Sequence, residues 1–128
     1  MSLKRDRYFG ETEQEVIAAW VGELARDATS LWHIVTDGRE GFELDGPELI
    51  DFVRRSLMAL FAAGAKPVMG KIDPDYLWGR VNKYGDDPQQ MTDAIIDEWQ
   101  KSGRDPDAGG IWFATPNVYG ERRRGSRG

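Results

Sequence analysis

The sequence predicts a single, mainly α-helical domain with a minor β component. At 128 residues the chain suits one domain with one hydrophobic core. Apolar residues recur at helical spacing over several stretches, and these stretches begin with patterns typical of helix N-termini. We expect four capped helices as two helix pairs, with a small β element near the C-terminus. Residues 1–10 are expected to be a flexible lead-in, 11–119 the globular domain and 120–128 a disordered basic tail.

The first expected helix spans residues 12–36. Thr12 and Glu15 have the spacing of a capping box, and apolar residues follow at helical spacing. The apolar phase does not slip across Thr29, which favours one long helix. The alternative is a break near Thr29 with a strand over 31–36, because that stretch is rich in β-branched and aromatic residues.

The second expected helix, over residues 45–64, is the predicted centre of the core. Asp45 and Glu48 have capping-box spacing, and Gly64 supplies a stop. Its polar stripe is narrow, which indicates that neighbours pack on more than one side. A short turn over 37–41 links it to the first helix, which predicts an antiparallel hairpin.

Two shorter helices are expected further along the chain, over 74–84 and 88–102. The second of these is expected to begin with a capping box between Asp87 and Gln90. Their spacing matches a helix-turn-helix, but the would-be recognition helix carries three carboxylates that phosphates would repel. We therefore expect no specific nucleic-acid binding. The carboxylates are Asp93, Asp97 and Glu98.

A short apolar run over 111–114 is the expected strand. Its backbone needs a partner, and the candidates are Val68-Met69 and Phe42–Leu44. Trp112 would lie on the opposite strand face from its neighbours, so it is the tryptophan that we expect to be exposed as a binding anchor. The other four are expected in the core: Trp20, Trp32, Trp78 and Trp99.

The overall composition is that of a soluble globular protein. Charged residues make up 30% and hydrophobic residues 40% of the chain. No apolar run reaches the roughly 18 residues of a membrane span, and the N-terminus lacks the apolar core of a signal peptide. Cysteine is absent, which excludes disulfides and thiolate metal sites. We expect a cytoplasmic protein that does not bind membranes.

The sequence contains no motif that predicts a catalytic site, a cofactor or a metal. His33 is the only histidine, and its place on the polar side of the first helix predicts a surface residue. The stretch from Asp105 to Gly110 begins like a calcium loop, but Pro116 occupies the position of the required glutamate. It is better interpreted as a glycine-rich turn.

Charge segregation is the strongest functional signal. Residues 11–51 hold eleven carboxylates against Arg26 and Arg39, whereas both chain ends are basic. An acidic surface steers basic proteins towards it. Our leading hypothesis is a small acidic protein-binding module with a basic protein partner, comparable in size and charge with inhibitors or immunity proteins of basic toxins. The expected partner-binding residues are Glu15, Glu23, Glu40, Glu43 and Trp112.

Two other functions stay open at this point. One is a small carboxylate-dependent enzyme, with or without a metal, that uses Glu40, Glu43 and Asp45. The other is a homo-oligomeric structural subunit that buries its excess aromatic residues.

Overall fold

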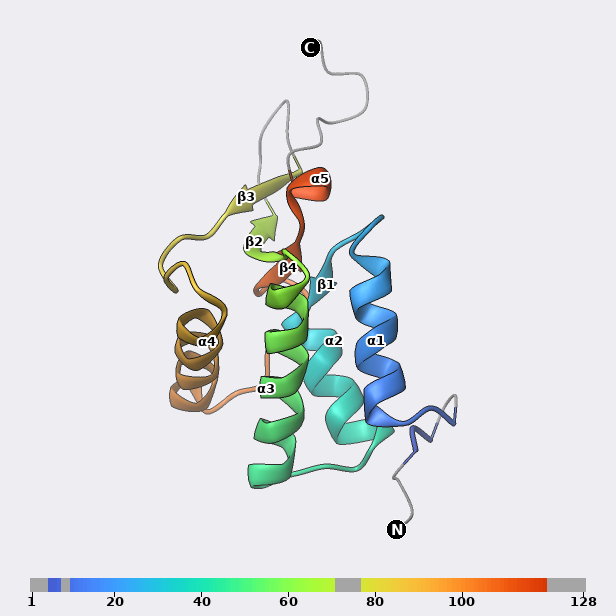
Figure 1. The fold of residues 1–128 in the computed structure, drawn as a ribbon. Helices are drawn as coiled ribbons and strands as arrows, with labels where there is room; N and C mark the ends of the chain where they lie inside the picture. The colour runs from blue at the N-terminus through green and yellow to red at the C-terminus, as the bar shows by residue number, and fades with distance from the viewer. Residues whose placement is uncertain (1–4, 8–9, 71–76, 120–128) are drawn as a thin grey trace.

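The computed structural model describes residues 5–7, 10–70 and 77–119 and shows a mainly helical fold with a small antiparallel sheet (Figure 1). The coarse fold class is therefore as predicted. The elements are α1 (Glu13–Glu23), β1 (Thr29–Ser30), α2 (Leu31–Thr36), the π-helical turn η1 (Asp37–Gly41), α3 (Gly46–Ala62), β2 (Lys66–Gly70), β3 (Trp78–Arg80), α4 (Pro88–Ser102), β4 (Trp112–Ala114) and α5 (Pro116–Tyr119).

Helix α3 is the central element, as predicted for residues 45–64. It lies between α4 on one side and α1 and α2 on the other (Figure 1). Phe52, Leu57 and Leu60 on this helix have no exposed surface. The predicted capping box at its start is wrong, because the Asp45 side chain makes no cap hydrogen bond and pairs with Arg39 instead.

The predicted long helix over 12–36 is wrong. Helix α1 ends at Glu23, and Thr29 and Ser30 form a strand that pairs with Phe113 and Trp112 of β4. The Ser30 hydroxyl then accepts a hydrogen bond from the His33 amide and caps a new helix, α2. The break near Thr29 was the alternative, but residues 31–36 are helix rather than strand. The predicted turn over 37–41 continues α2 as one π-helical turn.

The predicted helix over 74–84 is also wrong in the part that the structure describes; residues 71–76 lie outside it. Trp78–Arg80 is strand β3, and its hydrogen bonds to β2 place Gly70 opposite Trp78. An exposed strand edge that offers a full set of backbone partners outweighs a short apolar pattern at helical spacing. The arrangement as two helix pairs is accordingly not confirmed.

The predictions for α4 and β4 agree with the structure. The Asp87 carboxylate caps α4 by accepting from the Gln90 amide, but the Gln90 side chain accepts from the Asp86 amide, so only half of the predicted capping box forms. Gly103 ends the helix at a φ of 68°. Strand β4 pairs with β2, with Val68 opposite Trp112, which is one of the two expected pairings. The sheet order is β1-β4-β2-β3, so the β component draws on the first half of the chain as well, and the predicted small β element near the C-terminus is not confirmed.

None of the helices in the described ranges combines the length and the apolar character that crossing a lipid bilayer requires.

Candidate functional site

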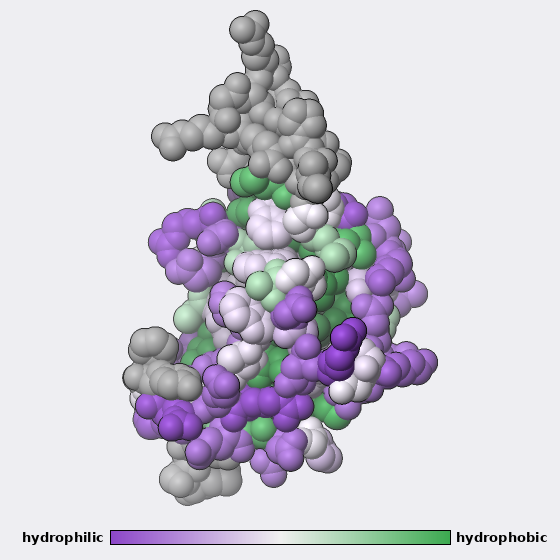
Figure 2. Space-filling model, turned by 180° about the vertical axis from the view of Figure 1, so that it is seen from behind, coloured by the Kyte–Doolittle hydropathy of each residue, from purple (hydrophilic) through white to green (hydrophobic). Residues whose placement is uncertain are grey.

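Carboxylates gather at one end of the molecule, which we call the acidic end and define as residues 5–7, 10–12 and 37–48. These residues carry seven carboxylates against three arginines. In Figure 1 the N-terminal segment, η1 and the start of α3 meet at this end, opposite the sheet. Seen from behind, hydrophilic residues crowd this end, whereas hydrophobic residues reach the surface towards the sheet (Figure 2).

A cleft of about 350 Å³ lies between α1 and α2 and opens at the acidic end. Helix α1 supplies an apolar wall, while α2, η1 and the N-terminal segment supply polar groups. Asp37 and His33 lie one helical turn apart and therefore face the cleft from the same side. The lining residues are Asp6, Glu11, Val16, Ala19, Trp20, His33 and Asp37.

Asp6 and Asp37 form a carboxyl pair beside this cleft. Asp6 is only 3% exposed, and both side chains line the cleft. Burial, the neighbouring Asp6 carboxyl group and the charge of Glu11 raise the pKa of Asp37 to about 7. A carboxyl in this state holds a proton close to neutral pH.

The carboxyl pair packs directly against Gly41. A Cβ atom at this position would lie 2.4 Å from the Asp37 Oδ1 atom and 2.5 Å from the Asp6 Oδ2 atom. The backbone amide of Arg7 also donates to the Gly41 carbonyl oxygen over 2.9 Å. Any side chain larger than hydrogen would therefore push the N-terminal segment away from η1.

Glu15 and Glu23, two of the expected partner-binding residues, are engaged locally. Glu15 completes the capping box that the sequence predicts: its carboxylate accepts from the Thr12 amide over 2.9 Å, which lowers the pKa of Glu15. Arg5 lies 3.7 Å from the same carboxylate. Glu23 pairs with Arg26 on the next turn. Their charges are thus largely balanced by neighbouring arginines.

Glu40 and Glu43 are both exposed, and neither makes an ion pair within the described residues. Glu43 has a φ of 56°, a left-handed conformation that is uncommon for a residue other than glycine. The structure thus exposes both of these expected residues at the acidic end, whereas Glu15 and Glu23 lie on α1.

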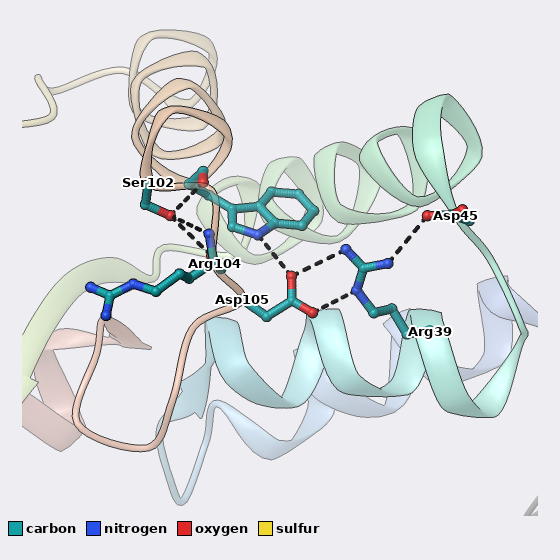
Figure 3. A network of polar contacts seen from close by, with 6 residues as sticks. Arg39, Asp45, Ser102, Arg104 and Asp105 are labelled. Carbon is teal, nitrogen blue, oxygen red and sulfur yellow. Dashed lines mark hydrogen bonds and ion pairs between the residues drawn. The ribbon is translucent and has the colours of Figure 1, made fainter.

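Arg39 is a cation of this end, and its guanidinium is shared between Asp45 of the same end and Asp105 of the loop after α4 (Figure 3). Its Nε atom binds the Asp105 carboxylate at 2.6 Å, and a second nitrogen lies 3.2 Å from Asp45. The Trp99 indole also donates to Asp105. We call Arg39, Asp45, Trp99 and Asp105 the arginine clasp; it joins η1, the start of α3 and the loop after α4.

Trp112 is half-buried and held in place on the far end of the molecule. Its ring centroid lies 5.5 Å from that of Trp78 and 6.0 Å from that of His33, and its indole donates to the Ala108 carbonyl oxygen. The exposed tryptophan is Trp32, at 37%, which was expected in the core. His33 is exposed, as predicted.

The carboxylates of the alternative enzyme hypothesis do not converge. Glu40 and Glu43 point to solvent, and Asp45 belongs to the arginine clasp. Within the described residues, no group of three or more histidine, aspartate or glutamate side chains is placed to hold a metal ion. The carboxyl pair that does form was missed, because only the tertiary fold brings Asp6 next to Asp37.

A scan against protein-family models and searches of curated proteins and solved structures found no match to this chain.

Proposed function

We propose that the protein is a small binding module whose acidic end recognises a basic patch on another protein. The observation that carries the proposal is the placement of Glu40 and Glu43. Both are exposed and without an ion pair in the described residues, at the end where carboxylates outnumber arginines. The negative charge that is not paired within the protein would attract a lysine- or arginine-rich partner.

Further carboxyl groups lie in the neighbourhood of these two residues. The charges of Asp6 and Glu11 oppose the ionisation of Asp37, which lies on the same turn as Glu40. The arginine clasp withdraws Arg39 towards Asp105. A basic partner would thus supply cations for the carboxylates that Arg39 does not reach.

A second candidate function follows from the raised pKa of Asp37 near neutrality. A carboxyl that gains and loses a proton near pH 7, beside a cleft that also holds an imidazole, suits general acid–base catalysis. Turnover of an ester, glycoside or phosphate substrate from a test panel, lost in Asp37→Asn and retained in Glu40→Gln, would support this enzyme function over the binding module.

Capture of a partner by charge-reversed variants tests the first proposal. The wild-type protein is used as bait in a lysate beside Glu40→Lys/Glu43→Lys and the control Asp97→Lys, which changes an exposed carboxylate on α4 that pairs with Lys101. We expect wild type and control to retain the same basic protein and the double variant to lose it, because only that variant reverses the acidic end.

Recovery of the same partner by all three baits would contradict the role of the acidic end. A bait that returns only further copies of itself would instead favour the homo-oligomeric subunit.

A further inference from the structure

A second cleft of about 350 Å³, which we call the α4 cleft, is lined mainly by helix α4 and by the loop that follows it. It shares no lining residue with the cleft between α1 and α2. Binding sites for small molecules have volumes of about 300–1,000 Å³, so this volume suits a ligand of modest size.

Apolar side chains supply one part of the wall of the α4 cleft. Leu31, Ile95 and Ile111 are 4%, 2% and 8% exposed, and the rings of Tyr84 and Trp99 lie beside the same space. An apolar group placed against these side chains would leave water and gain contacts with a rigid core surface.

Most of the charged groups that line the α4 cleft are already paired. The Glu98 carboxylate accepts from the Tyr84 hydroxyl over 2.8 Å and lies 2.9 Å from the Lys83 Nζ atom. Asp105 belongs to the arginine clasp, where the Arg39 Nε atom donates to it over 2.6 Å. These residues hold the wall in place and have little uncompensated charge to offer a ligand.

Arg104 and Asp107 differ from the other charged residues of this wall. Both are exposed, and neither side chain makes an ion pair within the described ranges, although the two residues are close together on one loop. The Arg104 side chain extends away from the arginine clasp (Figure 3). The Asp107 carboxylate accepts from the Gly109 amide over 2.9 Å, which positions it without neutralising it. The α4 cleft therefore has one unpaired cation and one unpaired anion beside an apolar wall.

We propose that the α4 cleft binds a free amino acid with an apolar side chain. The ligand carboxylate would pair with Arg104, its ammonium group with Asp107, and its side chain would pack against the apolar wall. A simple carboxylate or a simple amine of the same size would satisfy only one of the two charges, whereas a zwitterion satisfies both. This inference does not depend on the acidic end, which contributes no residue to the α4 cleft.

An NMR titration with L-phenylalanine tests the proposal, with the indole N–H of Trp99 as the reporter inside the cleft. Two analogues keep the phenyl ring: 3-phenylpropionate lacks the ammonium group, and 2-phenylethylamine lacks the carboxylate. We expect L-phenylalanine to shift the Trp99 signal to saturation and each analogue to bind about tenfold more weakly, because each loses one charge-assisted contact. Glycine, which lacks the apolar side chain, should also bind more weakly.

Two variants assign the two charges. Arg104→Gln should weaken L-phenylalanine binding about tenfold and leave 2-phenylethylamine unchanged. Asp107→Asn should weaken L-phenylalanine binding to a similar extent and leave 3-phenylpropionate unchanged; its amide oxygen can still accept from the Gly109 amide. The matched controls are Lys101→Gln and Asp97→Asn, which remove the same charges from an exposed pair on α4 outside the cleft and should keep the wild-type affinity.

Three results would overturn the proposal. The first is the absence of a saturable shift of the Trp99 signal with L-phenylalanine. The second is an unchanged affinity for L-phenylalanine in either Arg104→Gln or Asp107→Asn. The third is equal binding of L-phenylalanine and one of its two analogues, which would leave one of the two charges without a role.

Discussion

Gly38 shows how a single residue can hold two elements together. It lies in η1, next to helix α3, and a Cβ atom built on it would approach the Leu49 Cδ1 atom to 2.6 Å and the Phe52 Cδ2 atom to 3.0 Å. Its backbone conformation does not require glycine; the space does. The close approach of η1 to α3 thus depends on the absence of a side chain at Gly38.

We predict that Gly38→Ala destabilises the fold by about 1–3 kcal/mol, since the methyl group overpacks a buried contact. Gly22→Ala is the matched control, because nothing lies within 4 Å of its Cβ position on α1. That change should stabilise the protein by about 0.5–1 kcal/mol through helix propensity. Urea denaturation measures both, and equal effects would contradict the packing described for η1.

Side-chain roles were predictable from the sequence where they are local. The Thr12–Glu15 capping box and the Asp87 cap depend on residues three positions apart, and both form. The Asp45–Glu48 box has the same spacing and does not form, because Arg39 competes for the carboxylate. The Asp6–Asp37 pair left no local signal at all.

The same distinction holds for whole elements. Helices α3 and α4 were predicted because apolar periodicity and caps act within each segment. The strand at Thr29–Ser30 was missed because its partner, β4, lies near the other end of the chain. The apolar phase continues across this break because α1 and α2 both pack on the same core. Periodicity alone could not separate them.

The arginine clasp, which joins η1, the start of α3 and the loop after α4, should stabilise the protein. Arg39→Lys cannot reproduce the two-nitrogen contact with Asp105, and we expect it to cost about 0.5–1 kcal/mol, the range for a partly exposed ion pair. Lys101→Gln, which breaks the surface pair with Asp97, is the control and should cost less. Thermal unfolding at pH 7 compares the two.

The pH dependence of the clasp gives a second readout. The hydrogen bond from Arg39 lowers the pKa of Asp105, so the clasp stabilises the protein above about pH 4 and loses this effect as the pH falls. The difference between wild type and Arg39→Lys should therefore shrink in acid. A constant difference down to about pH 2 would show that Asp105 is not the partner that matters.

At the scale of the molecule, folding determines which charged residues lie next to one another. The sequence predicted an acidic stretch over 11–51 but not which part of it would stay uncompensated. The fold places Arg5, Arg26 and Arg55 beside carboxylates of α1, and so leaves the net charge at the acidic end. Only three-dimensional proximity decides which carboxylates remain available to a partner.

The association rate with a captured partner is the most direct test of recognition by the acidic end. Stopped-flow mixing at low and at physiological salt should show a several-fold fall in the on-rate, because the screening length shortens to about 8 Å. Glu40→Lys/Glu43→Lys should lower the low-salt rate further, and Asp97→Lys should change it little. An on-rate that is independent of salt, or equal in the two variants, would contradict the proposal.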